Sequence, residues 1–385
     1  MRKIWKVSTN VILLGLVSFL TDISSEMIHP LLPLFITLLG GGGVAVGIIG
    51  GVGDGLSSIL KVLSGFLSDK SGKRMPFIFS GYLLSSLCKI ALSLSTIWQH
   101  ILILRPLERV GKGLRTAPRD AIIADSSVKQ RGRAFGFHRA MDTSGAVGGS
   151  FLAFFLFYFL NFSFKRIFLL AGFIGLLALI PLFWVRTKRR GKRILSFKVS
   201  LKELSPSLRK FVFIATLFAL GNFSYMFFIL RARDFFPSPK LSVALPILLY
   251  IWFNIIYTLF SFPLGILSDK VGRKPLIISG YFLFGVTSLL FIWGKSWITF
   301  ILLFGLYGLV YSLIDGQQRS FVSDLAKEDL KATALGTFHT CVGLAAIPAG
   351  LIAGSLWQYV NPEATFIYGG TVGIISAIVF LNLSQ

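Results

Sequence analysis

Cysteine, acidic side chains and charge in general are scarce in this chain. Two cysteines, Cys88 and Cys341, stand far apart in the sequence, which excludes a disulfide framework. Only 14% of the 385 residues are charged, against 54% that are hydrophobic, and the mean hydropathy is +0.76. A soluble domain of this composition would need an implausibly large core, so we expect the lipid bilayer to be the solvent.

Nucleotide-binding and catalytic patterns are also missing. No Walker A sequence occurs, and Gly51-Val-Gly-Asp-Gly55 lies inside an apolar stretch, where glycines favour close helix packing. ATP is therefore not the expected source of energy. We find no nucleophile or metal constellation of the kind that an enzyme requires, so we expect neither an enzyme nor a cofactor.

Twelve apolar stretches are long enough to cross a bilayer as helices. They predict an all-α membrane protein in which two six-helix bundles, residues 1–185 and 211–385, are joined by a basic cytoplasmic linker at 186–210. The predicted spans are residues 11–38, 44–68, 75–96, 99–122, 134–159, 164–185, 211–230, 241–268, 275–294, 297–318, 332–357 and 365–384.

The positive charge of the chain has a clear distribution. Lys and Arg number 39 and Asp and Glu 16, a net charge of +23, which in a soluble protein would suggest a nucleic-acid partner. Here the basic residues gather in the N-terminal segment and the even-numbered connections, as the positive-inside rule describes. We therefore expect a multi-pass, monomeric protein of the cytoplasmic (inner) membrane, with both termini in the cytoplasm, in contact with lipids and without nucleic acid.

One ten-residue segment occurs twice, two hundred positions apart. Gly65-Phe-Leu-Ser-Asp69-Lys-Ser-Gly72-Lys73-Arg74 returns as Gly265-Ile-Leu-Ser-Asp269-Lys-Val-Gly272-Arg273-Lys274. Each copy lies between two apolar stretches, so we expect a parallel duplication of six-helix halves, an architecture typical of carriers. We expect Asp69 to accept backbone N–H groups or a cation from a neighbouring helix, and Gly65 to permit close helix approach. Lys73 and Arg74 should stay with cytoplasmic phosphates.

Both copies resemble the signature Gly-x-x-x-Asp-x-x-Gly-Arg/Lys-Arg/Lys of the major facilitator superfamily. This resemblance covers the whole chain and implies a secondary transporter that rocks two halves around a mid-membrane site, with the repeated segment serving as a gating motif.

Two shorter segments resemble motifs of the proton-driven antiporter branch of that superfamily. Arg109-Val-Gly-Lys-Gly113 resembles Arg-Val-x-Gln-Gly-x-Gly, with Lys112 in place of Gln and Arg115 in place of the last Gly. Gly145-Ala-Val-Gly-Gly149 resembles Gly-Pro-x-x-Gly-Gly, with Ala in place of Pro. The resemblance to this branch implies efflux by antiport.

Placing an ionisable side chain at bilayer depth costs free energy, so residues of this kind are candidates for a functional role. In the first half we expect Asp22, Glu26, Asp54, Glu108 and Asp142 to face Lys61, Lys89, Arg105, Arg109, Lys112 and Arg139. Such a set is either a static lattice of salt bridges or the place where one carboxylate takes up and releases a proton.

Comparison of the two halves places the coupling chemistry in the first. Asp22 and Asp54 correspond to the neutral Asn222 and Asn254. The proton-coupling candidates are Asp22, Glu26, Arg109 and Asp54, and we expect Asp22 and Glu26 to meet Arg109 across the cavity. We expect Glu108 to be a partner of Arg105 or Arg115.

The second half offers hydrogen-bonding and aromatic groups that suit an amphipathic organic substrate. The substrate-binding candidates are Asn222, Tyr225, Asn254, Tyr257 and Tyr311, with Lys112 from the first half. The same side chains are also compatible with ordinary helix packing. Together these features predict proton-coupled export of a small organic compound, a drug or a metabolite.

Two other cargoes remain open. His29 and His138, with Asp22, Glu26 and Asp142, could supply ligands to a divalent transition metal, which would make the chain a metal exporter. The basic stripe formed by Arg105, Arg109 and Lys112 could instead serve a carrier of organic anions.

Overall fold

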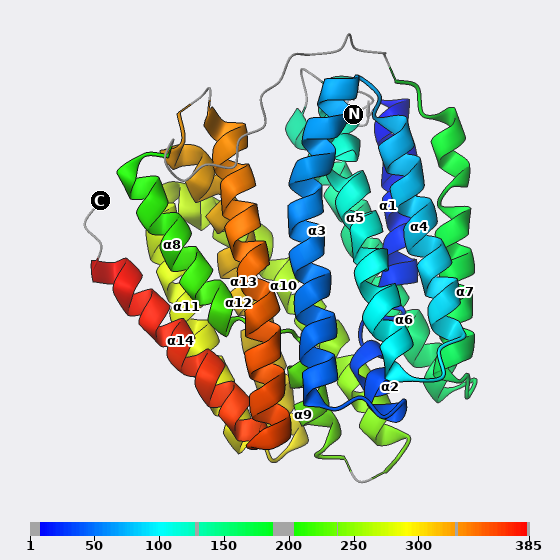
Figure 1. Cartoon of the computed structure of the whole chain (residues 1–385), viewed down its shortest axis with the longest axis vertical. Coiled ribbons are helices and arrows are strands. Elements are labelled where there is room, and N and C mark those ends of the chain that lie inside the picture. The colour runs from blue at the N-terminus through cyan, green and yellow to red at the C-terminus, as the bar shows by residue number, and fades with distance from the viewer. Residues whose placement is uncertain (1–7, 128–130, 188–203, 237, 328–329, 383–385) are drawn as a thin grey trace, which may run out of the picture. The chain divides into compact units, whose positions relative to one another are not determined.

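The structure, a computed structural model, describes residues 8–127, 131–187, 204–236, 238–327 and 330–382. Every regular element in these ranges is helical (Figure 1). The elements are α1 (Thr9–Glu26), α2 (Leu32–Leu38), α3 (Gly43–Ser71), α4 (Met75–Ser93), α5 (Trp98–Ser126), α6 (Arg131–Tyr158), α7 (Phe164–Leu177), η1 (Ile180–Trp184), α8 (Pro206–Gly221), α9 (Met226–Arg233), α10 (Leu241–Val271), α11 (Arg273–Leu290), η2 (Phe291–Trp293), α12 (Trp297–Leu325), α13 (Lys331–Tyr359) and α14 (Pro362–Asn382).

All twelve predicted spans are helical. Ten helical stretches are long and apolar enough to cross a membrane within the described ranges. The remaining two predicted spans, 11–38 and 99–122, are formed by α1 with α2 and by α5, which carry acids and a row of arginines. Large apolar side chains such as Phe183, Phe262 and Ile298 are 70–76% exposed, as expected where lipid replaces water.

Contacts divide the chain into two compact units. Unit 1 comprises Met1–Leu31 and Ile59–Ser196, and unit 2 comprises Leu32–Ser58 and Phe197–Gln385. The division differs from the predicted domains because α2 and the first part of α3 group with unit 2. Most of the predicted linker, residues 188–203, lies outside the described ranges, so the linker stays a prediction.

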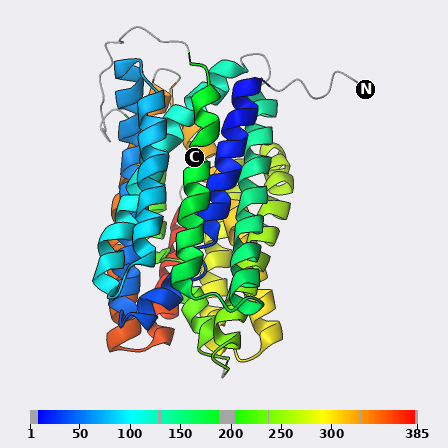
Figure 2. The ribbon, with the colours of Figure 1, turned by 90° about the vertical axis from the view of Figure 1, so that its right-hand side faces the viewer.

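Unit 1 is built around two pairs of closely packed helices, α1 with α6 and α4 with α5. Helix α7 lies against both α1 and α4, and Figure 2 shows α1 running between α6 and α7. Side chains that are almost fully buried, including Leu14, Val17, Ile78 and Ile123, form the apolar core. The polar faces of α1, α5 and α6 are therefore held in fixed register by this core.

Unit 2 has an aromatic core. Helix α10 packs on α12, α11 on both α12 and α14, and α8 on both α13 and α14 (Figure 1). Phe228 stacks on Tyr307 with ring centroids 4.2 Å apart, and Phe218 stacks on Tyr281 at 3.9 Å. Aromatic pairs of this kind add ~0.5–1.5 kcal/mol each beyond the area they bury, and they hold α9 against α12 and α8 against α11.

Two of the predicted spans are interrupted. In the first span α1 ends at Glu26, and a turn that contains Pro30 leads to α2, because proline has no N–H to continue the helical ladder. In unit 2, α8 ends at Gly221 and α9 begins at Met226, with Asn222 in a non-helical conformation (φ −82°, ψ 74°). Interrupted helices expose helix ends and free backbone groups within a span, as in many transporters.

Glycines bring α3 and α13 into backbone contact within unit 2. Gly43, Gly47, Gly51 and Gly55 recur every four residues and therefore share one face of α3. A Cβ on Gly43 would lie 2.8 Å from the carbonyl oxygen of Gly354, and one on Gly47 would overlap the carbonyl of Gly350. Val44 also donates its backbone N–H to Gln358 Oε1 at 3.1 Å.

Candidate functional site

The acidic stripe of α1 is buried in unit 1. Asp22 has Asp142 and Glu26 as acidic neighbours and Lys112 and Arg119 as basic ones. Of these charged groups Asp142, on the facing helix α6, acts most strongly on Asp22. Two carboxylates are therefore close together inside a span, where water does not screen their repulsion.

Asp142 is only partly satisfied by hydrogen bonds. Ser18 hydrogen-bonds to its carboxylate, and Ser18 in turn accepts from Arg119 Nη1 at 3.1 Å. His138 Nδ1 lies 3.6 Å from Asp142 Oδ2. The other carboxylate oxygen, Oδ1, is buried without a hydrogen-bond partner in the structure. Such an oxygen is an unused acceptor for a proton.

Glu26, the last residue of α1, contacts a histidine. His29 Nδ1 lies 2.9 Å from Glu26 Oε1, and both side chains are largely buried. Arg109 acts electrostatically on His29, Glu108 and Lys112. The cation that acts most strongly on Asp22 is Lys112 and not the expected Arg109. Lys112 is thus a basic neighbour of Asp22, and the meeting of Asp22 and Glu26 with Arg109 stays a prediction.

A buried ion pair and a buried lysine lie beside this acidic stripe. Glu108 Oε2 lies 2.6 Å from Arg105 Nη1, and both side chains are almost completely buried. This is one of the two partners expected for Glu108. Lys89, fully buried, donates to Ser24 Oγ at 2.8 Å and Ser25 Oγ at 2.9 Å. The Lys89 bonds join α4 to α1, whereas the Arg105–Glu108 pair lies within α5.

Arg115 has its own set of partners on α4. Its Nη1 donates to Ser85 Oγ at 2.6 Å, and its guanidinium lies 4.4 Å from the centre of the Tyr82 ring. The stacking and the hydrogen bond occupy this arginine, so it does not serve as the partner of Glu108 that was the alternative expectation.

A small cavity lies inside unit 2, between α8, α12 and α13. Its volume is ≈ 110 Å³, and it is lined by Ala215, Phe218, Ala219, Asn222, Val310, Tyr311, Ile314, Asp315, Gln318 and Val342. Two of the predicted substrate-binding residues, Asn222 and Tyr311, are in its wall. Their side chains are hydrogen-bonded to each other, whereas Asn222 Oδ1 is buried without a hydrogen-bond partner.

The carboxylate in this cavity, Asp315, was not among the predicted site residues. Its Oδ2 accepts from Tyr257 Oη at 2.9 Å and lies 2.7 Å from Arg319 Nη2. Tyr257, a predicted substrate-binding residue, therefore supports the cavity by holding Asp315. Comparison of the halves could not reveal Asp315, because the position two hundred residues earlier is Arg115.

The other predicted substrate-binding residues lie elsewhere. Tyr225 packs against Tyr250 with ring centroids 5.4 Å apart, and Asn254 Nδ2 donates to the Tyr250 carbonyl at 3.1 Å. Lys112, the candidate from the first half, lies in unit 1 near Asp22. Their binding roles stay predictions.

Asp54 differs from the expectation that it is buried among the bases of the first half. It belongs to the part of α3 that groups with unit 2, its side chain is exposed, and it acts electrostatically on Tyr307 and Tyr311. This part of α3 packs on α13 of unit 2 through its glycines, so Asp54 groups with unit 2.

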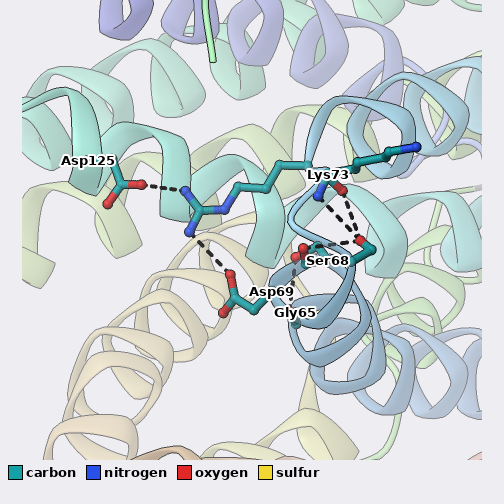
Figure 3. A network of polar contacts seen from close by, with 7 residues as sticks. Gly65, Ser68, Asp69, Lys73 and Asp125 are labelled. Atoms are coloured by element: carbon teal, nitrogen blue, oxygen red, sulfur yellow. Dashed lines mark hydrogen bonds and ion pairs between the residues drawn. The ribbon is translucent and has the colours of Figure 1, made fainter. Parts of the chain in front are cut away.

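The first copy of the repeated segment forms a bridge of three charged groups. Arg74 Nη2 lies 3.2 Å from Asp69 Oδ1, and Arg74 Nη1 lies 2.6 Å from Asp125 Oδ2 at the end of α5 (Figure 3). The prediction that Arg74 faces lipid phosphates is therefore wrong, because two carboxylates occupy its guanidinium. Lys73 is exposed, as that prediction required.

The glycines of the first copy have separate roles. Gly72 adopts a left-handed conformation (φ 67°), which a side chain would disfavour. A Cβ on Gly65 would lie 3.1 Å from the Cβ of Ala117, so Gly65 does permit the close approach of α3 and α5.

The second copy builds the same bridge from a different position. Arg273 lies 3.4 Å from Asp269 and 2.5 Å from Asp324, and Gly272 is again left-handed (φ 90°). Lys274 instead lies over the Phe380 ring. Gly265 has open space around it, in contrast to Gly65. The shared feature is thus an arginine between two aspartates, since a guanidinium can bond two carboxylates at once.

Metal ligands do not gather in the described ranges. No group of three or more His, Cys, Asp or Glu side chains there is placed to hold a metal ion. His29 and His138 each pair with one carboxylate, those of Glu26 and Asp142.

The duplicated helices, the paired bridges and the charged groups buried in spans define a membrane transport protein. The family model described as "Major Facilitator Superfamily" matches residues 14–247 and 212–384. The chain belongs to that superfamily. It is a multi-pass membrane protein and a secondary transporter of small molecules, not an enzyme.

Three similar proteins illustrate this relationship. An uncharacterised transporter of the superfamily, MJ1317 of Methanocaldococcus jannaschii, is 49% identical over 379 residues, which cover 98% of this chain and 95% of that protein. The crystal structure of the nucleoside transporter NupG matches with a TM-score of 0.79 at 14% identity, covering 97% of this chain and 98% of that one. The human organic anion transporter MFSD10 matches with a TM-score of 0.67 at 18% identity, covering 97% and 99%. The two structures show the fold alone.

Proposed function

We propose that the protein is a proton-coupled exporter that moves a small organic compound out of the cell by alternating access. It acts as a monomer in the cytoplasmic membrane, with both termini in the cytoplasm, as the distribution of Lys and Arg supports. The two segments that resemble antiporter motifs support the direction and the coupling ion. The coupling site is the pair of carboxylates Asp22 and Asp142, with Glu26 as a further acid on α1.

The observation that carries this proposal is the unused Oδ1 of Asp142 beside Asp22. A proton bound at either carboxylate removes the repulsion between the two groups, which lie on helices packed against each other. The neighbouring groups already have partners: Arg105 forms an ion pair with Glu108, and Lys89 donates hydrogen bonds to two serines of α1. The acids on α1 and α6 are thus the groups best placed to exchange protons.

Coupling follows from the attraction between Asp22 and Lys112, which depends on the protonation of Asp22. When Asp22 is ionised, it attracts Lys112 of α5, its strongest basic neighbour. When Asp22 is protonated, this attraction between α1 and α5 is lost, while the packing of α1 on α6 remains. Proton exchange therefore changes the energetic balance between two arrangements of the same helices, which is what a coupled carrier requires.

Everted membrane vesicles that contain the protein test this proposal. Vesicles are acidified inside by respiration, and a panel of amphipathic organic compounds is added while an acridine dye reports the internal pH. A transported compound should release protons from wild-type vesicles. Asp22→Asn should abolish this release, and Glu26→Gln should reduce it. Asp234→Asn, which changes an exposed acid at the end of α9, is the control and should behave like the wild type.

Two results would remove the proposal. One is proton release that persists in both the Asp22 and the Glu26 variants. The other is transport that proceeds at the same rate after the pH difference has been collapsed with nigericin.

One observation favours a second candidate, a carrier of organic anions. Arg105 is almost completely buried, yet its Nη2 has no hydrogen-bond partner in the structure. Arg109 and Lys112 follow on the same helix face at steps of four and three residues. This candidate predicts that Arg109→Ala abolishes binding of an organic anion such as benzoate, measured as a thermal shift of the purified protein. Unchanged binding in the variant would remove it.

A further inference from the structure

The cavity of unit 2 is partly open, and most of its lining is apolar. Phe218, Ile314 and Val342 contribute side chains from three different helices, α8, α12 and α13. Its volume of ≈ 110 Å³ is below the ~150 Å³ of an engineered apolar cavity that binds benzene. It therefore has room for one end of an organic molecule, of about five or six non-hydrogen atoms, rather than for a whole substrate.

Three electronegative features converge on this apolar space. The Asp315 carboxylate and the buried, unpartnered Oδ1 of Asn222 are both in the wall. The third is the C-terminal end of α8, because Asn222 caps this helix and Ala219 belongs to its last turn. The carbonyls of Phe218, Leu220 and Gly221 accept hydrogen bonds, and the aligned peptide dipoles leave this helix end with a partial negative charge that favours a cation.

The aromatic groups in the cavity wall also favour a cation. Phe218 and Tyr311 contribute aromatic rings to the lining, and a cation that lies near the face of such a ring is attracted to it. The lining contains no lysine or arginine. Arg319 approaches from outside the lining, and it pairs with Asp315 while about half of its own side chain is exposed. An ion pair this accessible is weak, so a ligand cation can share the carboxylate.

We propose that this cavity binds the ammonium end of a small aliphatic amine, with Asp315 and Asn222 Oδ1 as the acceptors of its N–H groups. Tyr257 positions Asp315 through the 2.9 Å hydrogen bond, and the apolar wall receives the adjoining methylene groups. The inference rests on the proposed function in one respect, namely that the bound amine is part of the exported compound.

The test uses three probes of one carbon skeleton on the purified full-length protein in detergent: n-butylamine, butyramide and butyrate. Affinity is taken from the dependence of the thermal unfolding midpoint on probe concentration. Butylamine should bind at least tenfold more tightly than butyramide, and butyrate should not bind. Asp315→Asn should weaken butylamine about tenfold or more, as loss of a charge-assisted hydrogen bond does, and should leave butyramide within threefold.

Matched variants separate this cavity from general charge effects. Asn222→Ala should weaken both butylamine and butyramide, since it removes an acceptor that serves either N–H group. Asp234→Asn removes an exposed acid of the same unit and should change neither. The wild-type comparison of the three probes needs no variant, so it decides the question even where a substitution prevents folding.

Three outcomes would overturn the proposal: butyrate binding as tightly as butylamine, butylamine affinity unchanged within twofold in Asp315→Asn, or none of the probes binding. These outcomes are independent of proton coupling. Amine binding together with coupling that survives in the Asp22 and Glu26 variants refutes the coupling site alone, whereas coupled export of another compound without amine binding refutes this subsite alone.

Discussion

The guanidinium of Arg74 lies 2.6 Å from the carboxylate of Asp125 and also reaches Asp69 at 3.2 Å. The start of α4 is thereby joined both to the end of α3 and to the end of α5. The second half repeats this bridge with Arg273, although the arginine stands one position earlier in the repeated segment. The duplication has preserved a chemical group between two aspartates rather than a sequence position.

Replacing Arg74 by Lys should slow transport without unfolding the protein. An ammonium is a point charge that does not offer the planar fork of a guanidinium to two carboxylates. The bridge is partly exposed, so its contribution to stability is ~0–1 kcal/mol. We expect the thermal midpoint to change little and the rate of counterflow in proteoliposomes to fall several-fold.

The adjacent Lys73 provides the control, since it is exposed and Lys73→Gln removes a positive charge of the same segment without changing the bridge. Counterflow in this variant should match the wild type. Equal rates for Arg74→Lys and Lys73→Gln would show that the bridge does not contribute to transport.

Gly47→Ala should destabilise unit 2. The new methyl group would overlap the carbonyl of Gly350, so α3 and α13 would have to separate. Overpacking of this kind costs ~1–3 kcal/mol. Gly316→Ala is the control, because a Cβ there meets nothing within 4 Å. Thermal unfolding followed by tryptophan fluorescence should show a lower midpoint for the first variant alone, and equal midpoints would contradict the close contact.

The Arg105–Glu108 pair should show strong energetic coupling. Glu108→Gln leaves a buried guanidinium without its counter-ion, which costs ~3–5 kcal/mol. The double variant Arg105→Met, Glu108→Leu should recover part of this loss, since it removes both charges. The measurement is a double-mutant cycle of unfolding in SDS, with the exposed pair Arg233 and Asp234 as a control whose coupling stays below ~1 kcal/mol. Additive effects at Arg105 and Glu108 would contradict the pair.

The helices were predictable because a span needs about twenty apolar residues, and this signal is strong in the sequence. The ends of the helices were less predictable from the sequence. Helix α5 continues to Ser126 and α12 to Leu325, beyond the predicted ends at 122 and 318. Asp125 and Asp324 lie in these extensions, which carry charge because they leave the apolar core. The aspartates that complete the two bridges were therefore missed.

The candidate sites were predicted in part, for a related reason. Acids on α1 stood out against the apolar background, and comparison with Asn222 drew attention to Asp22. Comparison between the halves draws attention to an acid whose counterpart is the corresponding neutral amide, as Asn222 is for Asp22. Asp315 corresponds to an arginine and gives no such signal. The nearest base of Asp22 depends on how α5 is rotated against α1, which spacing along one helix does not determine. Pro30 was the available signal for the break after α1, whereas the break at Asn222 had no proline to mark it.

The central claim is that protons drive transport through the carboxylates of Asp22 and Asp142. The most direct measurement compares two activities of one variant, Asp22→Asn, in proteoliposomes loaded with a compound found in the vesicle screen. Counterflow needs binding and alternation but no net proton movement, whereas accumulation against a gradient requires coupling. The account predicts that Asp22→Asn retains counterflow and loses accumulation driven by a pH difference. Accumulation at the wild-type level in this variant would contradict it.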